Sequence, residues 1–176
     1  MKSKRLNWDL VNTYSRELID NKKNYNDFML GIYLQIALRS ALRGNDILKL
    51  KKSNFKFNTG TCKLVTQKTN VPFSFALPDW LMKLIETIEN EDIFYNPKYG
   101  GTYTIVWVNL RLKKQFGNAG VSSHSIRKSA GLKMYQNAGV NGASNFLTHK
   151  SLQHTRTYLE LDELETLQLQ KNVFGD

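Results

Sequence analysis

The sequence predicts a single α+β domain that is mainly helical and carries one small antiparallel sheet of three strands. Apolar residues recur at helical spacing over most of the chain. Residues 55–75 instead alternate apolar and polar side chains around two turn sequences, which is the pattern of short strands. The length of 176 residues and the apolar content of 41% suffice for one substantial core.

Three helices are expected near the start of the chain. Residues 7–20 place apolar side chains on one helical face, and Asn7 can cap the first turn. After a break at residues 21–24, a second helix begins at Asn26 or Asp27 and runs to about residue 38. This helix is apolar on most sides, so we expect it to be buried, and it is too short to span a bilayer. Gly44 should then interrupt the chain before a short helix capped by Asn45.

The predicted sheet is followed by three more helices. Turn sequences at residues 58–61 and 67–70 separate the three strands. Pro78 and Asp79 open a helix that reaches about residue 88, and residues 96–101 are expected to form a flexible loop. The next helix covers residues 105–116, and the last of the three begins at Ser122 or Ser123.

The charge of the chain is concentrated before residue 159. The net charge is +10, but five of the 15 acidic residues and only Lys171 of the 25 basic ones follow Tyr158. Residues 1–158 therefore carry 24 basic and 10 acidic side chains, or +14. Such a surplus indicates a polyanionic partner, most often nucleic acid, although a basic surface that only aids solubility is the alternative.

Cysteine and histidine usage excludes several other classes of protein. The single cysteine, Cys62, cannot form an internal disulfide, and no charged leader precedes an apolar signal core, so a cytoplasmic location is expected. The three histidines and one cysteine lack the spacing of zinc ligands. No glycine-rich phosphate loop precedes a lysine, and no cofactor is expected.

The segment 147–158 carries the strongest indication of chemistry. It ends in Tyr158, and a free phenol, with a pKa of about 10, needs neighbouring cations and a proton acceptor to act as a nucleophile. Leu-Thr-His-Lys-Ser, with Tyr158 nine residues after His149, resembles the closing motif of the tyrosine recombinase (phage integrase) family, usually Leu-Gly-His-x-Ser. Thr148 stands where the family usually has glycine. An ordinary amphipathic helix with Tyr158 packed inward is the alternative.

Two arginine motifs continue this resemblance. Residues 40–50 resemble the first arginine motif of the family, which makes Arg43 the first catalytic arginine and Asp46 its supporting acid, although a structural pair of the two is the alternative. His124 and Arg127 resemble the second motif, usually His-x-Leu-Arg. Residues three apart share a helix face, here at the positive end of the helix dipole, which favours anion binding. Lys68 matches the family's hairpin lysine, although exposed turns often carry lysines of no special role.

The resemblance implies the fold and activity of a site-specific tyrosine recombinase, and it covers the chain from about residue 26. Tyr158 would attack a DNA phosphodiester and form a 3′-phosphotyrosyl link without metal or ATP. Arg43, Lys68, His124, Arg127 and His149 would assist it. A type IB topoisomerase-like enzyme and a non-catalytic DNA-binding relative are the alternatives. The expected setting is a mobile element in the cytoplasm of a bacterial or phage host cell, associated with the nucleoid when DNA is bound.

The remaining expectations concern domains and partners. We expect one catalytic domain at residues 1–176, without the family's N-terminal core-binding domain, and double-stranded DNA as the partner of a dimer or tetramer. The acidic, leucine-containing tail at 159–176 either folds back onto its own domain or docks as a helix on a neighbouring copy. Contacts to the DNA backbone, or only a solvated surface, are expected from five basic residues: Arg111, Lys113, Lys114, Lys128 and Lys150.

Overall fold

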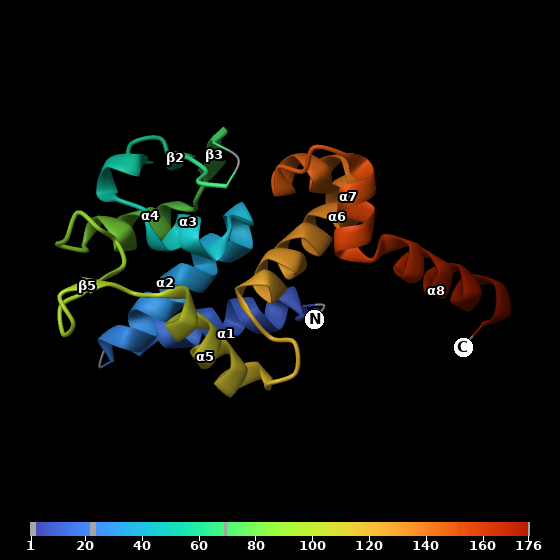
Figure 1. The fold of residues 1–176 in the computed structure, drawn as a ribbon, viewed down its shortest axis with the longest axis horizontal. Helices are drawn as coiled ribbons and strands as arrows, with labels where there is room; N and C mark the ends of the chain where they lie inside the picture. Colours follow the sequence, from blue (N-terminus) through green and yellow to red (C-terminus); the bar gives the residue numbers. More distant parts are fainter. Residues whose placement is uncertain (1–2, 22–23, 69, 176) are drawn as a thin grey trace. The chain divides into compact units, whose positions relative to one another are not determined.

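The computed structural model describes residues 3–21, 24–68 and 70–175, and the chain divides into two compact units, Met1–Ala130 and Gly131–Asp176 (Figure 1). We call them unit 1 and unit 2. The predicted class, mainly helical with a small antiparallel three-stranded sheet, is confirmed. No helix in the described ranges is long and apolar enough to cross a membrane.

A helical hairpin forms the base of unit 1. Helix α1 (Trp8–Asp20) begins where the Asn7 side chain accepts a hydrogen bond from the Leu10 N–H at 3.0 Å, as predicted. Helix α2 (Tyr25–Ser40) packs along α1, and its residues from Met29 to Leu38 are all buried. The cap of α2 is Asn24, slightly earlier than predicted, because its side chain accepts from the Asn26 and Asp27 N–H groups.

The turn into helix α3 (Gly44–Leu48) differs from the prediction. The extended residue before α3 is Arg43, so Asn45 lies inside the helix and does not cap it. Gly44 does not interrupt the chain either, because it is the first residue of α3. A Cβ atom at Gly44 would lie 2.7 Å from Tyr33 Oη and 3.2 Å from Ser123 Cβ, so only glycine permits this close approach.

The sheet is antiparallel and has three strands, as predicted. Strands β1 (Phe55–Lys56), β2 (Thr61–Val65) and β3 (Pro72–Ala76) form the antiparallel order β1-β2-β3, with Cys62 paired to both Phe55 and Phe75. The turn between β2 and β3 is closed by the Thr66 N–H, which donates to the Val71 carbonyl at 3.0 Å. Thr69, within the predicted second turn, lies outside the described residues.

Three elements complete unit 1 before the chain enters its long helix. Helix α4 (Asp79–Glu86) is followed by a hairpin of β4 (Tyr95–Asn96) and β5 (Gly101–Thr102), whereas the sequence predicts only a flexible loop at residues 96–101. Helix α5 (Ile105–Phe116) covers the predicted residues, with Thr104 as its N-cap and Gly117 directly after its last residue. Helix α6 (Ser123–Leu147) begins directly after Ser122, also as predicted, and its first turns pack into the core through Ile126.

Unit 2 contains the rest of α6, helix α7 (Leu152–Leu159) and helix α8 (Leu161–Phe174). Gly139 has φ 66° and ψ −172°, so α6 is interrupted there at a residue that tolerates a positive φ. Buried residues of this unit include Ala143, Leu147 and Leu159. The side chains of Leu147 and Leu159 approach Gly131, where a Cβ atom would lie only about 3 Å from them, so α6 and α7 pack closely.

Candidate active site

The backbone between α2 and α3 brings two arginines of unit 1 together. Ala41 has a left-handed conformation, with φ 48°, and its carbonyl accepts a hydrogen bond from Arg127 Nη1 on α6. Arg127 is only 6% exposed. Arg43 lies two residues after Ala41, is half-buried, and its side chain makes no capping hydrogen bond. The guanidinium of Arg127 is therefore fixed beside the loop that carries Arg43.

His124 lies within the field of three cations of unit 1. The pKa of His124 is lowered from its ordinary value of 6.5, first by loss of hydration and then by the charges of Arg127, Arg43 and Lys68. The structure thus brings together the four predicted residues of this unit. A lowered pKa keeps the imidazole neutral at pH 7, so His124 is able to accept a proton there.

A titration of His124 tests this arrangement without any enzyme assay. Below pH 6.5 an ordinary histidine is mostly protonated, whereas His124 should stay neutral to lower pH. We expect NMR titration of the His124 ring to give a pKa below 6.5, and Lys68→Met to move it upward because one repelling charge is removed. The control is Lys83→Met on α4, which should leave the value unchanged. A pKa above 6.5 in the unaltered chain would contradict the arrangement.

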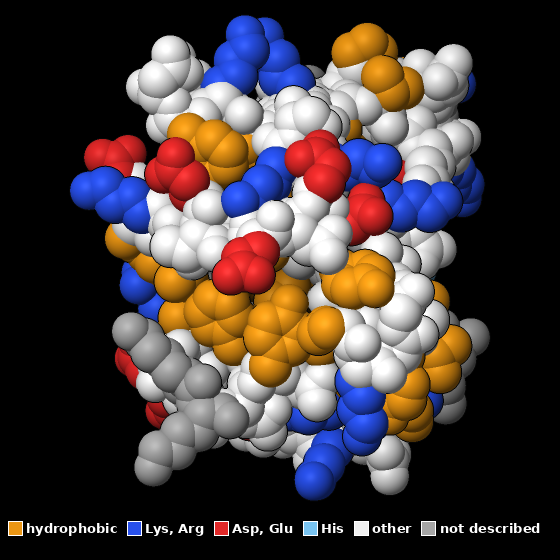
Figure 2. Space-filling view, turned by 90° about the vertical axis from the view of Figure 1, so that its left-hand side faces the viewer, with side chains coloured by type: hydrophobic (Ala, Val, Ile, Leu, Met, Phe, Trp, Pro, Cys, Tyr) orange, Lys and Arg blue, Asp and Glu red, His pale blue; other side chains and the backbone are white. Residues whose placement is uncertain are grey.

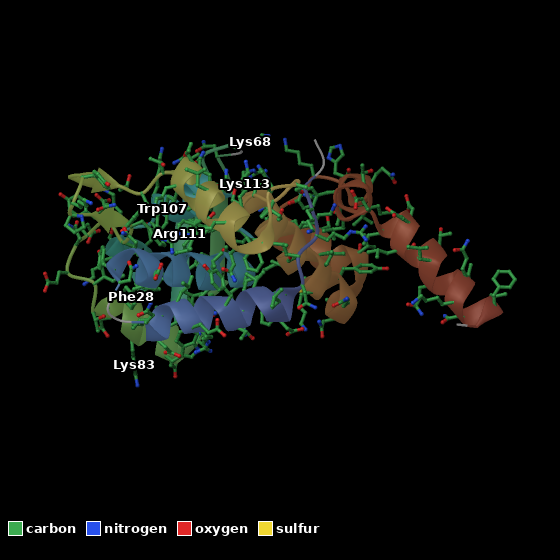
Figure 3. All side chains as sticks on the ribbon, turned by 90° about the horizontal axis from the view of Figure 1, so that it is seen from below. Phe28, Lys68, Lys83, Trp107, Arg111 and Lys113 are labelled. Atoms are coloured by element: carbon green, nitrogen blue, oxygen red, sulfur yellow. The ribbon has the colours of Figure 1, made fainter. Side chains whose placement is uncertain are left out.

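Asp46 holds the hairpin that carries Lys68. Asp46 is buried, and its Oδ1 accepts a hydrogen bond at 3.0 Å from the backbone N–H of Gln67, the residue before Lys68. Lys68 itself is exposed in the turn. In the view of Figure 3, Lys68 lies toward the upper edge of unit 1 and Lys83 toward its lower edge. Asp46 of α3 thus anchors the base of the turn that carries Lys68.

The C-terminus of α6 positions His149 in unit 2. The Thr148 N–H donates to the Asn145 carbonyl at 3.1 Å, and the His149 N–H donates to the Ser144 carbonyl at 3.0 Å. These two bonds form a Schellman motif, in which the residue at the position of Thr148 is left-handed and is usually glycine. Thr148 has φ 54°. Glycine, which the family usually carries at this position, adopts a positive φ without steric cost. The backbone of Thr148 is strained in the same conformation.

We expect Thr148→Gly to stabilise the fold by about 0.5–1 kcal/mol. A left-handed conformation costs an L-residue roughly 1–2 kcal/mol, part of which is offset by the greater freedom of glycine in the unfolded chain. The measurement is the free energy of unfolding from denaturant titration. Thr157→Gly, in the exposed part of α7, is the control and should destabilise by about 0.3 kcal/mol, the difference in helix propensity. Equal destabilisation by both changes would contradict the assignment of strain to Thr148.

His149 and Tyr158 lie against each other. Their ring centroids are 5.3 Å apart and the planes meet at 88°, an edge-to-face contact. His149 Nδ1 lies 3.0 Å from Thr155 Oγ1, one turn of α7 before Tyr158. Helix α7 begins where Ser151 Oγ accepts from the His154 N–H at 3.2 Å. Both predicted residues of unit 2 are thus brought together by the C-terminus of α6 and the face of α7.

Comparison with known proteins identifies the family. The model of the phage integrase family matches residues 10–165. The chain belongs to the phage integrase family. A probable integrase/recombinase of Acholeplasma phage L2 is 24% identical over 169 residues, which cover 91% of this chain and 57% of that protein. The chain therefore spans little more than half the length of this integrase relative.

Solved integrases and recombinases share the fold. XerH site-specific recombinase, in a post-cleavage complex with a palindromic difH substrate, has a TM-score of 0.73 at 16% identity, over 100% of this chain and 54% of its own. A lambda integrase dimer bound to a COC′ core site has a TM-score of 0.66 at 18% identity, over 90% and 60%. The catalytic domain of bacteriophage HP1 integrase has a TM-score of 0.64 at 14% identity, over 99% of both chains.

Two further side chains of this integrase-family chain, Tyr135 and Cys62, have raised pKa values. Tyr135 Oη donates to Glu165 Oε1 at 2.7 Å, and this hydrogen bond is the largest cause that raises the pKa of Tyr135. Burial raises the pKa of the Cys62 thiol to about 12. Both groups are therefore held in their protonated, weakly nucleophilic forms.

The five basic residues expected to contact DNA fall into two groups. Lys113, Lys114 and Lys150 are exposed. Arg111 is half-buried and its guanidinium is paired with Asp27 of α2, and Lys128 is 2% exposed, with its Nζ 3.5 Å from the Ser3 carbonyl. The three exposed lysines remain candidates for phosphate contacts, whereas Arg111 and Lys128 stabilise the packing of unit 1.

Two residues of the integrase site gained a role only from the structure. Ala41 supplies the carbonyl that holds Arg127, and nothing in the sequence marks a backbone acceptor. Thr155 lies within the segment 147–158, but its contact with His149 depends on how α7 faces the end of α6. The spacing of three residues between Thr155 and Tyr158 was the available signal, because it places both on one helix face.

Proposed function

We propose that this chain is the catalytic part of a site-specific recombinase that breaks and rejoins double-stranded DNA through a 3′-phosphotyrosyl intermediate. The observation that supports the proposal is the presence of two groups of reactive side chains, one in each unit, in a chain of the integrase family. In unit 1, the charges of Arg43, Lys68 and Arg127 help to lower the pKa of His124, which keeps the imidazole neutral at pH 7. In unit 2, the predicted nucleophile Tyr158 lies against His149. The reaction requires both sets at the same phosphate.

Each residue then has a defined task. The Tyr158 oxygen attacks phosphorus, its proton passes to His124, and the bond from phosphorus to the 5′ oxygen breaks. Arg43 and Arg127 bind the non-bridging oxygens with their planar forks, and His149 donates to one of them. Lys68 protonates the leaving 5′ oxygen. A 5′ hydroxyl of another strand later attacks the phosphotyrosine and reverses these steps.

The proposal includes neither metal nor ATP, for chemical reasons. The energy of the cleaved diester is kept in the phosphotyrosyl bond, so rejoining needs no further energy source. Arginine and lysine side chains supply the positive charge that stabilises the phosphoryl oxygens in the transition state. The proposed location is the cytoplasm of a bacterial or phage host cell, with the protein on the nucleoid when DNA is bound.

We propose that DNA lies on the part of unit 1 that carries Arg43, Lys68 and His124, because the charges of Arg43 and Lys68 both act on His124. The face of unit 1 that carries the β4–β5 hairpin is less suited to binding DNA, because an apolar patch there is surrounded by charges of both signs (Figure 2). Tyr25, Phe28 and Tyr95 line a pocket of about 360 Å³ on α2 and this hairpin. Solved XerH and lambda integrase of the same fold are bound to DNA, which supports the choice of partner.

A nicked suicide duplex tests the proposed function. The nick lets the short 3′-side product leave, so a covalent adduct accumulates if Tyr158 cleaves DNA. We expect an adduct that withstands denaturation and, with two matched sites, recombinant product. Binding without any adduct would leave a DNA-binding relative as the function. Relaxation of plasmids without recombinant product would instead indicate a topoisomerase of type IB.

We further propose that the end of α8 docks on a second copy of the chain. The first turns of α8 are held within unit 2, because Arg156 Nη2 lies 2.6 Å from Asp162 Oδ1 and 2.5 Å from Glu165 Oε2. Apolar side chains further along α8 are exposed to solvent: Leu169 is 63% and Phe174 is 83% exposed. We therefore propose docking in trans for the later part of α8 only.

Removing residues 167–176 tests the docking and keeps the Arg156 ion pairs. We expect synapsis and full recombination to fall much more than first-strand cleavage of the suicide duplex, because only the former require a second copy. The readouts are a gel assay of synaptic complexes and the yield of adduct. Glu163→Gln, an exposed change on the same helix before residue 167, is the control. Undiminished recombination by the shortened chain would contradict docking in trans.

A further inference from the structure

Thr155 occupies an unusual place for a hydroxyl group. It is 0% exposed, although it lies in the first turn of the short helix α7. Burial of a hydroxyl is costly unless it forms a hydrogen bond, and Thr155 Oγ1 lies 3.0 Å from His149 Nδ1. A valine would fill the same volume without this bond, so packing alone gives no reason for the hydroxyl.

We propose that Thr155 is a positioning residue that sets the tautomer and the orientation of His149. A neutral imidazole has one nitrogen that donates and one that accepts. In our assignment the Thr155 hydroxyl donates to Nδ1, so the ring proton stays on Nε2. The Nε2–H is then the donor that a phosphoryl oxygen requires. This inference rests on the function proposed above, in which His149 donates to the phosphate.

The geometry links this bond to the nucleophile. Thr155 and Tyr158 are three residues apart on α7, so they share a helix face. His149 contacts Thr155 through Nδ1 and Tyr158 through the edge-to-face contact of the two rings. Its backbone is held by the bond to the Ser144 carbonyl. One turn of α7 thus fixes the imidazole relative to the phenol.

The ring state of His149 gives the first test, and it needs no catalysis. The full-length chain is labelled with ¹⁵N at histidine, and the resonances of His149 are assigned by comparison with His149→Gln. We expect Nδ1 of His149 to be unprotonated and Nε2 to carry the proton in the unaltered chain. Thr155→Ser should retain this tautomer, and Thr155→Val should lose it. A proton on Nδ1 in the unaltered chain would overturn the proposal, whether or not Thr155→Val folds.

First-strand cleavage of the suicide duplex gives the second test. We expect Thr155→Val to lower the cleavage rate about 10–100-fold, the usual effect of losing a partner that orients a ligating or catalytic histidine, and Thr155→Ser to restore most of the rate. Thr157→Val, the same change at an exposed position of α7, should have little effect. Equal rates for Thr155→Val and the unaltered chain, with the tautomer unchanged, would refute the positioning role.

The two tests separate failure of the positioning role from failure of the proposed function. A chain that forms no adduct at all would refute recombination. The NMR experiment would in that case still decide whether Thr155 sets the His149 tautomer. A chain that cleaves DNA equally well with valine at position 155 would leave recombination intact and remove only the positioning role.

Discussion

Tyr158→Phe should abolish the covalent adduct with a suicide duplex, lowering its yield by about 10³-fold or more. The change removes the attacking oxygen and keeps the aromatic ring that meets His149 at 5.3 Å, so the fold should be preserved. DNA binding should be nearly unchanged, because the proposed phosphate contacts come from cationic side chains. Denaturing gels measure the adduct, and salt-dependent mobility shifts measure the binding.

Tyr135→Phe is the matched control for this prediction. Tyr135 also lies in unit 2, but its hydroxyl donates to Glu165, and its pKa is raised. We expect near-normal adduct from Tyr135→Phe. Adduct that persists in Tyr158→Phe and disappears in Tyr135→Phe would move the nucleophile to Tyr135 and contradict our assignment.

Arg43→Lys should lower the rate of first-strand cleavage about 10²–10³-fold, comparable to the loss of one oxyanion donor in other enzymes. Lysine keeps the charge but loses the planar fork that binds two phosphoryl oxygens. Because the Arg43 side chain makes no capping hydrogen bond, stability should change little. Cleavage rates and free energies of unfolding are measured together to separate the two effects.

Arg39→Lys is the control for the loss of a planar guanidinium. Arg39 lies on α2, four residues before Arg43. Arg39 lies 5.9 Å from the centre of the Trp80 ring, outside the proposed site, and its replacement should leave the cleavage rate nearly unchanged. Arg127→Lys should resemble Arg43→Lys in cleavage and also lose some stability, because Arg127 donates to the Ala41 carbonyl. Near-normal cleavage by Arg43→Lys would contradict a phosphate clamp.

Periodicity predicted most elements of the fold, and it failed where tertiary contacts or very short strands determine the structure. Helices with a side-chain cap at their start, such as α1 with Asn7, were located closely. The start of α3 was misjudged because it depends on the close approach of Gly44 to Tyr33 and Ser123, which are distant in sequence. The β4–β5 hairpin was missed because strands of two residues carry no detectable alternation.

The candidate site was predictable to the extent that it is encoded in motifs. His124 and Arg127 were placed together by helical spacing, and their neighbourhood with Arg43 and Lys68 follows only from tertiary packing. Spacing alone also could not distinguish exposed from buried cations. Lys113 and Lys128 both belong to basic helical segments, yet only Lys113 is exposed, because Lys128 faces the segment that precedes α1.

Mass spectrometry of the adduct tests the central claim most directly. The intact chain is incubated with a suicide duplex of known sequence, the adduct is digested with protease and nuclease, and the nucleotide-bearing peptide is sequenced by fragmentation. We predict one modified residue, Tyr158, joined to the 3′ phosphate of the cleaved strand, with a free 5′ hydroxyl on the released strand. A link to any other residue, or to a 5′ phosphate, would contradict the account.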